Sequence, residues 1–199
     1  MNAKGPQRRP ARALEDETLT TADVLERSAD ISEFVRCTFI ACDLQGPWMA
    51  GRTFAECTFR DCDLSLADLY RTALQEVTFE RCKLVGARFD RCHTFLLSLS
   101  FAQCILDLAS FHGLKLKGTR FMGCRMRETD LSDADLSNAS FAGSDLGAAL
   151  FDGTMLEGAD LRSAVHYSID PTRNRLRKAR FSADGLSGLL DRSGIIIEA

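Results

Sequence analysis

The chain has 199 residues, of which 45% are apolar, so it can form one substantial core. Its formal net charge of −3 is small, and the average charge therefore indicates neither a nucleic-acid nor a membrane partner. No apolar run approaches the length of a membrane span, which argues against an integral membrane protein.

Residues 1–30 are expected to form an N-terminal tail or cap that is partly disordered. The first twelve or so residues are polar and contain prolines. No apolar segment follows their basic residues, so they lack the pattern of a signal peptide. We therefore expect a cytoplasmic protein whose cysteines stay reduced. The next segment, TTADVLERSAD, is compatible with a short helix or with an irregular first coil, and the pattern leaves both open.

From Phe34 onward, a large apolar residue recurs at every fifth position. The series runs to Phe89, slips by two residues within the segment 90–95, and resumes at Leu96 to continue to Leu161. All twenty-six positions of this series are Phe, Leu or Met. Apolar residues spaced five apart would spiral around an α-helix, and on a straight strand they would point alternately to opposite faces. The period therefore indicates a chain that turns a corner after every repeat, as in a solenoid of stacked units.

The position two residues before each apolar centre is mostly small. This regularity favours Cys as a small buried residue and argues against a disulfide framework. A zinc site is the alternative, but the cysteines follow the repeat period and not the short CxxC spacing of a tetrahedral site, so we predict no metal and no cofactor. All eight cysteines occupy this position: Cys37, Cys42, Cys57, Cys62, Cys82, Cys92, Cys104 and Cys124.

Charge is unevenly distributed over the last third of the chain. Residues 128–161 contain eight acidic residues and no Lys or Arg. Residues 173–180 contain five basic residues and no acidic one. Such segregation describes surfaces and partners rather than fold.

Residues 164–199 are expected to form a C-terminal cap and dimerisation segment with a short α-helix. Ser182 is the expected N-cap of this helix, and Gly194 is expected to end it. The apolar face of the helix would comprise Leu186, Leu189 and Leu190.

The repeat units CTFIA, CDLSL, ADLYR, ADLSN, SDLGA and ADLRS resemble those of the pentapeptide-repeat family. The resemblance covers about residues 31–163, with the register break near 90–95. It implies an all-β fold, a right-handed quadrilateral β-helix with four pentapeptides per coil. At the spacing of neighbouring strands, the repeats would make a rod about 30 Å long.

The segment HYSIDPTRNRLRKARF and the apolar helix after it are similar to the branch of this family that protects topoisomerases, which includes microcin immunity, albicidin-resistance and quinolone-resistance proteins. The resemblance implies a non-enzymatic DNA mimic that binds DNA gyrase or another type II topoisomerase and protects it from a poison, or modulates it. It also implies a homodimer, with no direct nucleic-acid binding, no membrane and no small-molecule substrate. The expected dimer interface comprises His166, Tyr167, Phe181, Leu186, Leu189, Leu190, Ile195, Ile196 and Ile197.

In such a coil the acidic residues would point outward on neighbouring faces of the rod. A rod of duplex-like width with periodic negative charge would attract a DNA-binding protein as DNA does, because phosphate charge supplies much of that attraction. The alternative is a solvated surface that only keeps the solenoid soluble. The predicted partner-binding residues are Asp130, Asp133, Asp135, Asp145, Asp152 and Glu157.

Catalysis has little support in the sequence. No nucleophile elbow, P-loop or Gly-rich dinucleotide turn is present, so we predict that the protein is not an enzyme. The register break supplies a second candidate contact, formed by His93, Thr94 and Phe95. A structural protein–protein interaction module with an unrelated partner is therefore the alternative function.

Overall fold

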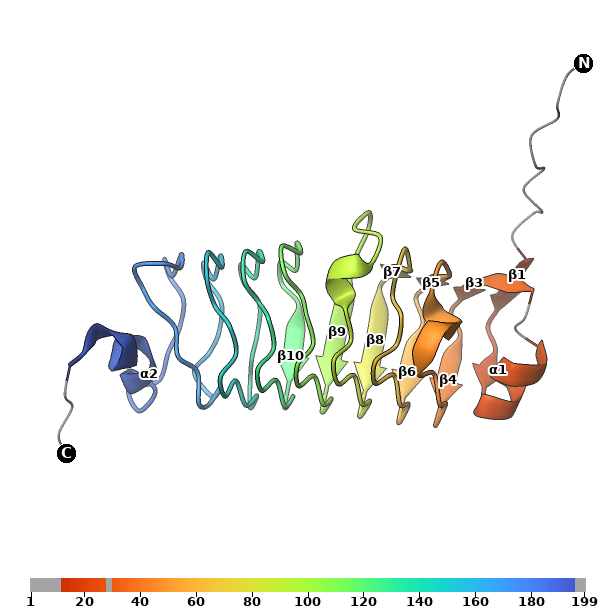
Figure 1. Ribbon diagram of the computed structural model, residues 1–199, viewed down its shortest axis with the longest axis horizontal. Helices are drawn as coiled ribbons and strands as arrows, with labels where there is room; N and C mark the ends of the chain where they lie inside the picture. Colours follow the sequence, from red (N-terminus) through yellow and green to blue (C-terminus); the bar gives the residue numbers. More distant parts are fainter. Residues whose placement is uncertain (1–11, 28–29, 196–199) are drawn as a thin grey trace, which may run out of the picture.

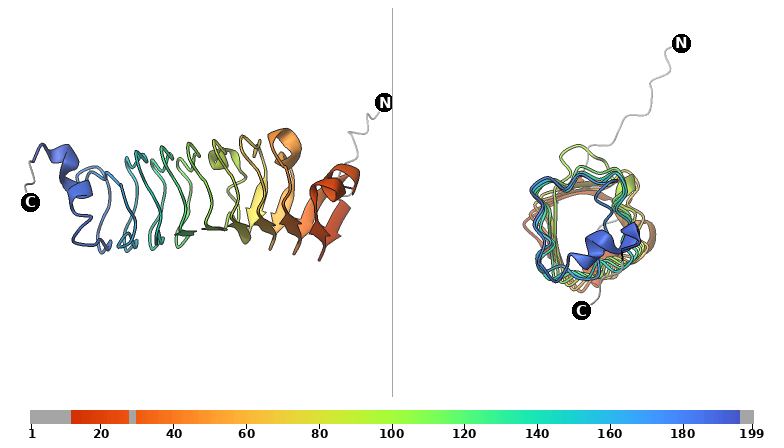
Figure 2. Two further views of the ribbon diagram at one scale, coloured as in Figure 1. Left: turned by 90° about the horizontal axis from the view of Figure 1, so that it is seen from below. Right: turned by 90° about the vertical axis from the view of Figure 1, so that its left-hand side faces the viewer.

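The computed structural model describes residues 12–27 and 30–195, in which the chain winds into a long rod of stacked coils with a short helix at each end (Figure 1). Strands of successive coils pair in parallel with a step of twenty residues, as in Phe39 opposite Phe59 and Phe59 opposite Phe79. Seen along its axis, the rod has four flat sides (Figure 2). The predicted all-β quadrilateral solenoid with a short C-terminal helix is confirmed.

Two parallel sheets form two of these sides in the N-terminal half of the rod. The four-stranded sheet comprises β1 (Arg12–Glu15), β3 (Ile31–Val35), β5 (Thr53–Ala55) and β7 (Ala73–Gln75). The six-stranded sheet comprises β2 (Thr18–Leu19), β4 (Thr38–Ile40), β6 (Thr58–Arg60), β8 (Val77–Glu80), β9 (Leu99–Ala102) and β10 (Arg120–Met122).

The helical elements are short and lie at the ends or corners of the rod. They are α1 (Thr21–Arg27), η1 (Gly46–Met49), η2 (Phe89–Arg91), α2 (Ser187–Leu190) and η3 (Asp191–Ser193). No helix in the described part of the chain is long and apolar enough to cross a bilayer.

The core is the column of apolar centres that the period of five predicts. Phe39, Phe59, Phe79, Phe101 and Phe121 are all buried, and their rings stack from coil to coil at centroid distances of 4.5 to 5.3 Å. One of the twenty-six predicted centres is wrong. Leu96 is 60% exposed because it lies in the loop that interrupts the repeat.

The corners of the rod require a left-handed backbone conformation. The second residue after most apolar centres has a positive φ, for example +51° at Arg36 and +56° at Asp133. Many of these positions are Gly, which adopts this conformation without strain. At Gly153 there is a second reason, since a Cβ would lie 2.4 Å from Oδ1 of Asp133 on the previous coil.

The register break lies slightly later than the sequence indicates. His93 is still in register with Ala73, twenty residues earlier, whereas Leu99 pairs with Val77 at a distance of twenty-two. The two extra residues are therefore accommodated between His93 and Leu99, a segment that overlaps the end of the predicted range 90–95. The resulting loop projects from the rod between β8 and β9 (Figure 1).

The coil extends beyond the limits of 31 and 163 at both ends. At the N-terminal end, β1 pairs with β3 and β2 pairs with β4. Of the two alternatives for TTADVLERSAD, the short helix is observed as α1, and the first coil is formed by the residues that precede this segment. At the other end, Asp160 pairs with Arg180. The basic segment 173–180 is thus a coil of the rod and not a separate cap.

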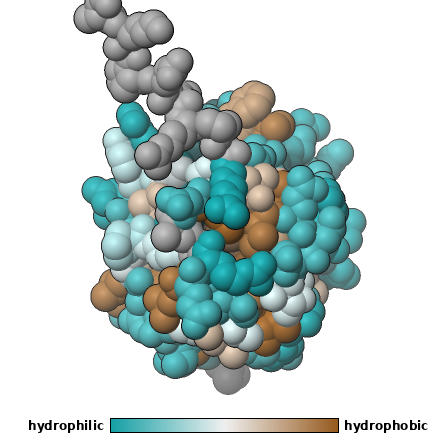
Figure 3. Space-filling view, turned by 90° about the vertical axis from the view of Figure 1, so that its right-hand side faces the viewer, coloured by the Kyte–Doolittle hydropathy of each residue, from teal (hydrophilic) through white to brown (hydrophobic). Residues whose placement is uncertain are grey.

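Each end of the rod carries a covering element. Val24 of α1 is buried at the N-terminal end, where mainly hydrophilic residues surround a smaller apolar area (Figure 3). The C-terminal helix α2 is one turn long and begins later than expected, because Leu186 and not Ser182 is its N-cap. Ser182 nevertheless accepts a hydrogen bond from the Gly185 N–H, and Gly194 ends the segment at φ +71°.

Candidate partner-binding surfaces

The predicted acidic residues lie on neighbouring sides of the rod. Asp130 is in register with Leu150, and the Asp133 N–H donates to the Asp152 carbonyl, so these acids share one side and its corner, here called the Asp130 side. Asp135 is in register with Met155, which places it a quarter turn further along the coil. The geometry predicted for the acidic residues is therefore observed.

The carboxylates of Asp130 and Asp133 differ in their hydrogen bonds and ion pairs. Asp130 accepts the Ser132 N–H at 3.0 Å, which fixes its carboxylate in a tight turn. Its other oxygen lies 4.0 Å from Nδ1 of His112. Asp133 is exposed and forms no ion pair with any described residue. Both carboxylates can therefore meet a partner at the surface.

Asp145 and Asp152 are already neutralised by cations of the chain. Asp145 accepts hydrogen bonds from Arg127 at 2.8 Å and contacts Nδ1 of His166 at 2.9 Å. Burial acts to raise the pKa of Asp145, but these hydrogen bonds outweigh it and the pKa is lowered. Asp152 pairs with Arg173 on the next coil. These two acids contribute less to an acidic surface than the sequence indicates.

A groove of about 480 Å³ lies beside Asp135 and Glu157. Asp135 accepts hydrogen bonds from the N–H and the hydroxyl of Ser137, which together with nearby lysines lower its pKa although burial acts to raise it. Lys117 borders the groove on one side and Arg177 and Lys178 on the other. The acidic surface on this side of the rod is therefore bounded by basic residues.

The loop in the register break exposes apolar as well as polar groups. His93 and Thr94 are exposed, and Phe95 is 67% exposed. The Phe95 N–H donates to Nδ1 of His93 at 3.3 Å, so the loop has a defined turn. The three residues therefore form an exposed, projecting surface, which Leu96 enlarges, and their contact with a partner stays a prediction.

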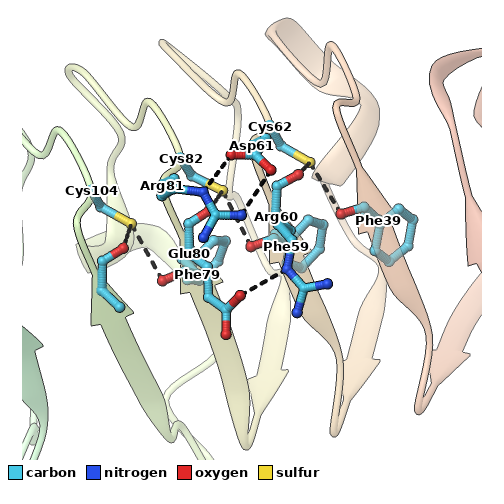
Figure 4. Close-up of polar contacts among 11 residues, drawn as sticks. Phe39, Phe59, Arg60, Asp61, Cys62, Phe79, Glu80, Arg81, Cys82 and Cys104 are labelled. Atoms are coloured by element: carbon cyan, nitrogen blue, oxygen red, sulfur yellow. Dashed lines mark hydrogen bonds and ion pairs between the residues drawn. The ribbon is translucent and has the colours of Figure 1, made fainter.

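The cysteines line the interior of the rod and are all buried. The thiols of Cys62, Cys82 and Cys104 each donate to the carbonyl of a Phe in the preceding coil, at 3.3 to 3.4 Å (Figure 4). Burial raises the pKa of Cys57 to about 12, which disfavours the thiolate that a metal requires. Within 12–27 and 30–195, no group of three or more His, Cys, Asp or Glu residues could hold a metal ion.

The residues predicted at a dimer interface differ in their exposure. His166, Leu186, Leu190 and Ile195 are exposed at the C-terminal end, and Phe181 and Leu189 are half-buried against the core. Ile196 and Ile197 lie outside the described residues. Tyr167 is largely buried within the chain, where its ring packs 5.6 Å from that of Phe181. Its place at a dimer interface stays a prediction.

Sequence reasoning missed the position of the basic segment. Arg175 is in register with Met155, and Arg180 with Asp160. These cations therefore lie on the coil that directly follows the last coil of the acidic segment 128–161. The signal is present in the sequence, because Leu176 and Phe181 continue the period of five from Leu161 without any slip. The composition of the tail nevertheless predicts a cap, since no further repeat unit of the usual composition follows Ser163.

The fold and these surfaces define a β-solenoid that displays polar groups on flat outer sides around a dry core. Two family descriptions match its sequence: "pentapeptide repeat region" over residues 32–99 and "pentapeptide repeats (8 copies)" over residues 129–165, together more than half of the chain. The protein belongs to the pentapeptide-repeat family.

Solved structures with the same fold include QnrB1, described as a plasmid-mediated fluoroquinolone resistance protein. Two trypsin-treated forms of it match with TM-scores of 0.62 and 0.60, at 20% and 19% identity, over 95% and 94% of this chain and 100% and 98% of theirs. Full-length QnrB1 gives a TM-score of 0.50 at 19% identity, over 93% of this chain and 98% of that one. At these identities the likeness shows the fold. No curated protein sequence matches significantly.

Proposed function

We propose that this protein is a non-enzymatic DNA mimic that binds DNA gyrase or another type II topoisomerase and protects it from a poison, or modulates it. The observation that carries the proposal is the straight, flat-sided rod with Asp130 and Asp133 unburied on one side. Regularly spaced carboxylates on a rigid rod can occupy a basic DNA-binding surface, because such surfaces bind phosphate largely through charge.

The likeness to QnrB1 supports this choice of target. QnrB1 is described as a fluoroquinolone resistance protein, and fluoroquinolones act on type II topoisomerases. The match extends over nearly the whole of both chains, so the two folds are similar in extent.

The proposal includes a homodimer formed through the C-terminal end. Leu186, Leu190 and Ile195 leave apolar surface exposed there, and such surface is usually covered by a partner. A second copy would double the length of the rod. Truncation before Phe181 should yield a folded monomer, as measured by light scattering; a truncated protein that remains dimeric would place the interface elsewhere.

A supercoiling assay with purified gyrase tests the function most simply. The protein is added over a wide concentration range, with and without several gyrase poisons, and supercoiling and poison-stabilised cleavage are measured. The proposal predicts that the protein inhibits supercoiling or reduces poison-stabilised cleavage. If neither quantity changes with any poison, the topoisomerase is not the target.

The exposed loop favours one second candidate, an interaction module for an unrelated protein. Phe95 and Leu96 are adjacent in the sequence and are both exposed on the loop that projects from the rod. Exposed apolar anchors of this kind often dominate protein interfaces. Replacing Phe95 and Leu96 with Ser should then abolish partner binding while Asp130→Asn and Asp133→Asn leave it unchanged. The DNA-mimic proposal predicts the opposite pattern.

A further inference from the structure

The C-terminal half of the rod gathers its basic residues on one side. Arg120 is in register with Ser140, Ser140 with Asp160, and Asp160 with Arg180, so both arginines lie on the side formed by β10. Backbone hydrogen bonds from Gly118 to Ser137, from Asn138 to Glu157 and from Gly158 to Arg177 define the adjoining corner. This basic side comprises Lys117, Arg120, Arg162, Arg177, Lys178 and Arg180.

Most of these cations are available to a partner. All six are exposed. Only Arg162 forms an ion pair with a described carboxylate, that of Asp160 at 2.7 Å. The same pair holds the pKa of Asp160 at about 2, so this acid is neutralised by its neighbour. Asp135 and Glu157 are the other acids beside these cations, and both are half-buried. The six cations therefore outnumber the three acids. The side therefore retains a net positive charge.

The basic side lies opposite the Asp130 side. Ser140 follows Asp130 by ten residues, which is half of the twenty-residue coil, and the coil has four flat sides (Figure 2). The two surfaces therefore face away from each other across the core. A partner on one side leaves the other side open.

The shape of this side fits a long, regular polyanion. Several of its outward residues between the cations are small, including Ser140, Ala142 and Gly143, and a phosphate backbone can approach closely there. Arg120 and Arg180 are three coils apart, or about 14 Å along the rod. Duplex DNA carries one charge per about 1.7 Å of its axis, so several phosphates fall within that length.

We propose that the basic side binds the phosphate backbone of duplex DNA, without reading its sequence. This revises the expectation that the protein makes no direct contact with nucleic acid. An anionic membrane is less favoured, because Met122 is the one large apolar residue exposed among these cations, and surface-bound proteins usually insert several. The inference does not depend on the topoisomerase proposal, since it concerns the opposite surface and binding without enzyme.

Fluorescence anisotropy with a labelled duplex of about 20 base pairs tests this, at salt concentrations from about 50 to about 200 mM. We expect wild-type binding that weakens as salt rises. Arg177→Gln with Arg180→Gln should weaken binding roughly tenfold at the lowest salt and reduce the log–log salt slope by about 2. The matched control, Arg71→Gln with Arg91→Gln, removes the same charge from exposed positions on another side and should change affinity less than about twofold.

Three results would overturn the proposal. The first is the absence of wild-type binding at the lowest salt. The second is an equal loss in the test and control variants, which would mean that only the overall charge matters. The third is binding to phosphatidylserine-containing vesicles but not to the duplex, which would assign the surface to a membrane. Circular dichroism melting of each variant establishes that the rod remains folded.

Discussion

The two halves of the rod share one core pattern but arrange their charges differently. In the N-terminal half, opposite charges alternate along a column, so that Arg60 pairs with Glu80 at 2.8 Å and Lys83 with Asp63 at 3.5 Å. In the C-terminal half, Asp145 and Asp152 still pair with Arg127 and Arg173. The acids without an arginine partner, however, include Asp130 and Asp133 on the Asp130 side, and most cations without a carboxylate partner lie on the basic side. Outward positions do not determine the fold, and the sequence is therefore free to alternate charge in one half and to segregate it in the other.

The interior differs as well. The N-terminal half has longer strands, stacked Phe rings and most of the cysteines, whereas the C-terminal half has mainly Leu, Ala, Ser and Thr inside and is held by isolated bridges. Thr129 and Ser144 donate to carbonyls of the preceding coil, as the thiols do in the other half. The two halves thus fill equivalent interior positions with different side chains.

Breaking the shared core should have the largest effect. Phe121 is fully buried, with ring centroids of Phe101 and Phe141 each 5.2 Å away, so Phe121→Asp would bury a carboxylate without a partner and should unfold the C-terminal half. Phe121→Ala should lower the free energy of unfolding by about 3–5 kcal/mol in urea. Met122→Ala, at the next and exposed position, is the control. A Phe121→Asp protein that melts like wild type would contradict the assigned core.

Detaching the C-terminal helix should have the next largest effect. A Cβ on Gly188 would lie 2.2 Å from the backbone oxygen of Tyr167, which cannot move away, so Gly188→Ala should displace α2. Since the Ile169 N–H donates to the Gly188 carbonyl at 2.8 Å, hydrogen exchange at Ile169 reports the displacement directly. Ser187→Ala is the control on the same helix. Protection of Ile169 that survives in the Gly188 variant would show that α2 does not pack as described.

The sequence predicted most of this core because apolar centres and corners repeat with one period. It failed where the period is interrupted, because Leu96 has the right spacing but lies in a loop. The side of the rod on which each acid lies could be predicted, since it follows from counting residues along the twenty-residue coil. The pairing of Asp145 with Arg127 and His166 could not, because it depends on side-chain reach between coils.

Alternating and segregated charges should respond differently to neutralisation. Glu80→Gln removes the partner of Arg60 and should lower the free energy of unfolding by about 0.5 kcal/mol, a typical value for a surface pair. Asp133→Asn removes a carboxylate that has no described cation partner and lies beside Asp152, so stability should be unchanged or slightly higher. Urea titrations of both variants measure the difference. A destabilised Asp133→Asn protein would indicate that its charge is structural.

Lowering the pH should produce the smallest of these effects on the free energy of unfolding. The Arg162 hydrogen bonds lower the pKa of Asp160 from 3.8 to about 2. A carboxyl with a lowered folded-state pKa contributes stability above its unfolded value, and that contribution is lost as pH falls from 3.8 towards 2. Because the pair is partly solvated, the change should be small. Asp160→Asn should flatten the pH dependence of urea stability in this window, and an unaltered profile would mean that the pair contributes nothing.

The affinity for gyrase as a function of salt tests the central claim, that the segregated acids of the C-terminal half form the binding surface. Wild type is compared with Asp130→Asn plus Asp133→Asn and with Glu56→Gln plus Glu76→Gln, which removes two exposed acids from adjacent coils of the N-terminal half. The account predicts that the C-terminal pair weakens binding roughly tenfold and flattens its salt dependence, while the N-terminal pair changes little. Equal losses in both variants, or no loss in the C-terminal one, would contradict it.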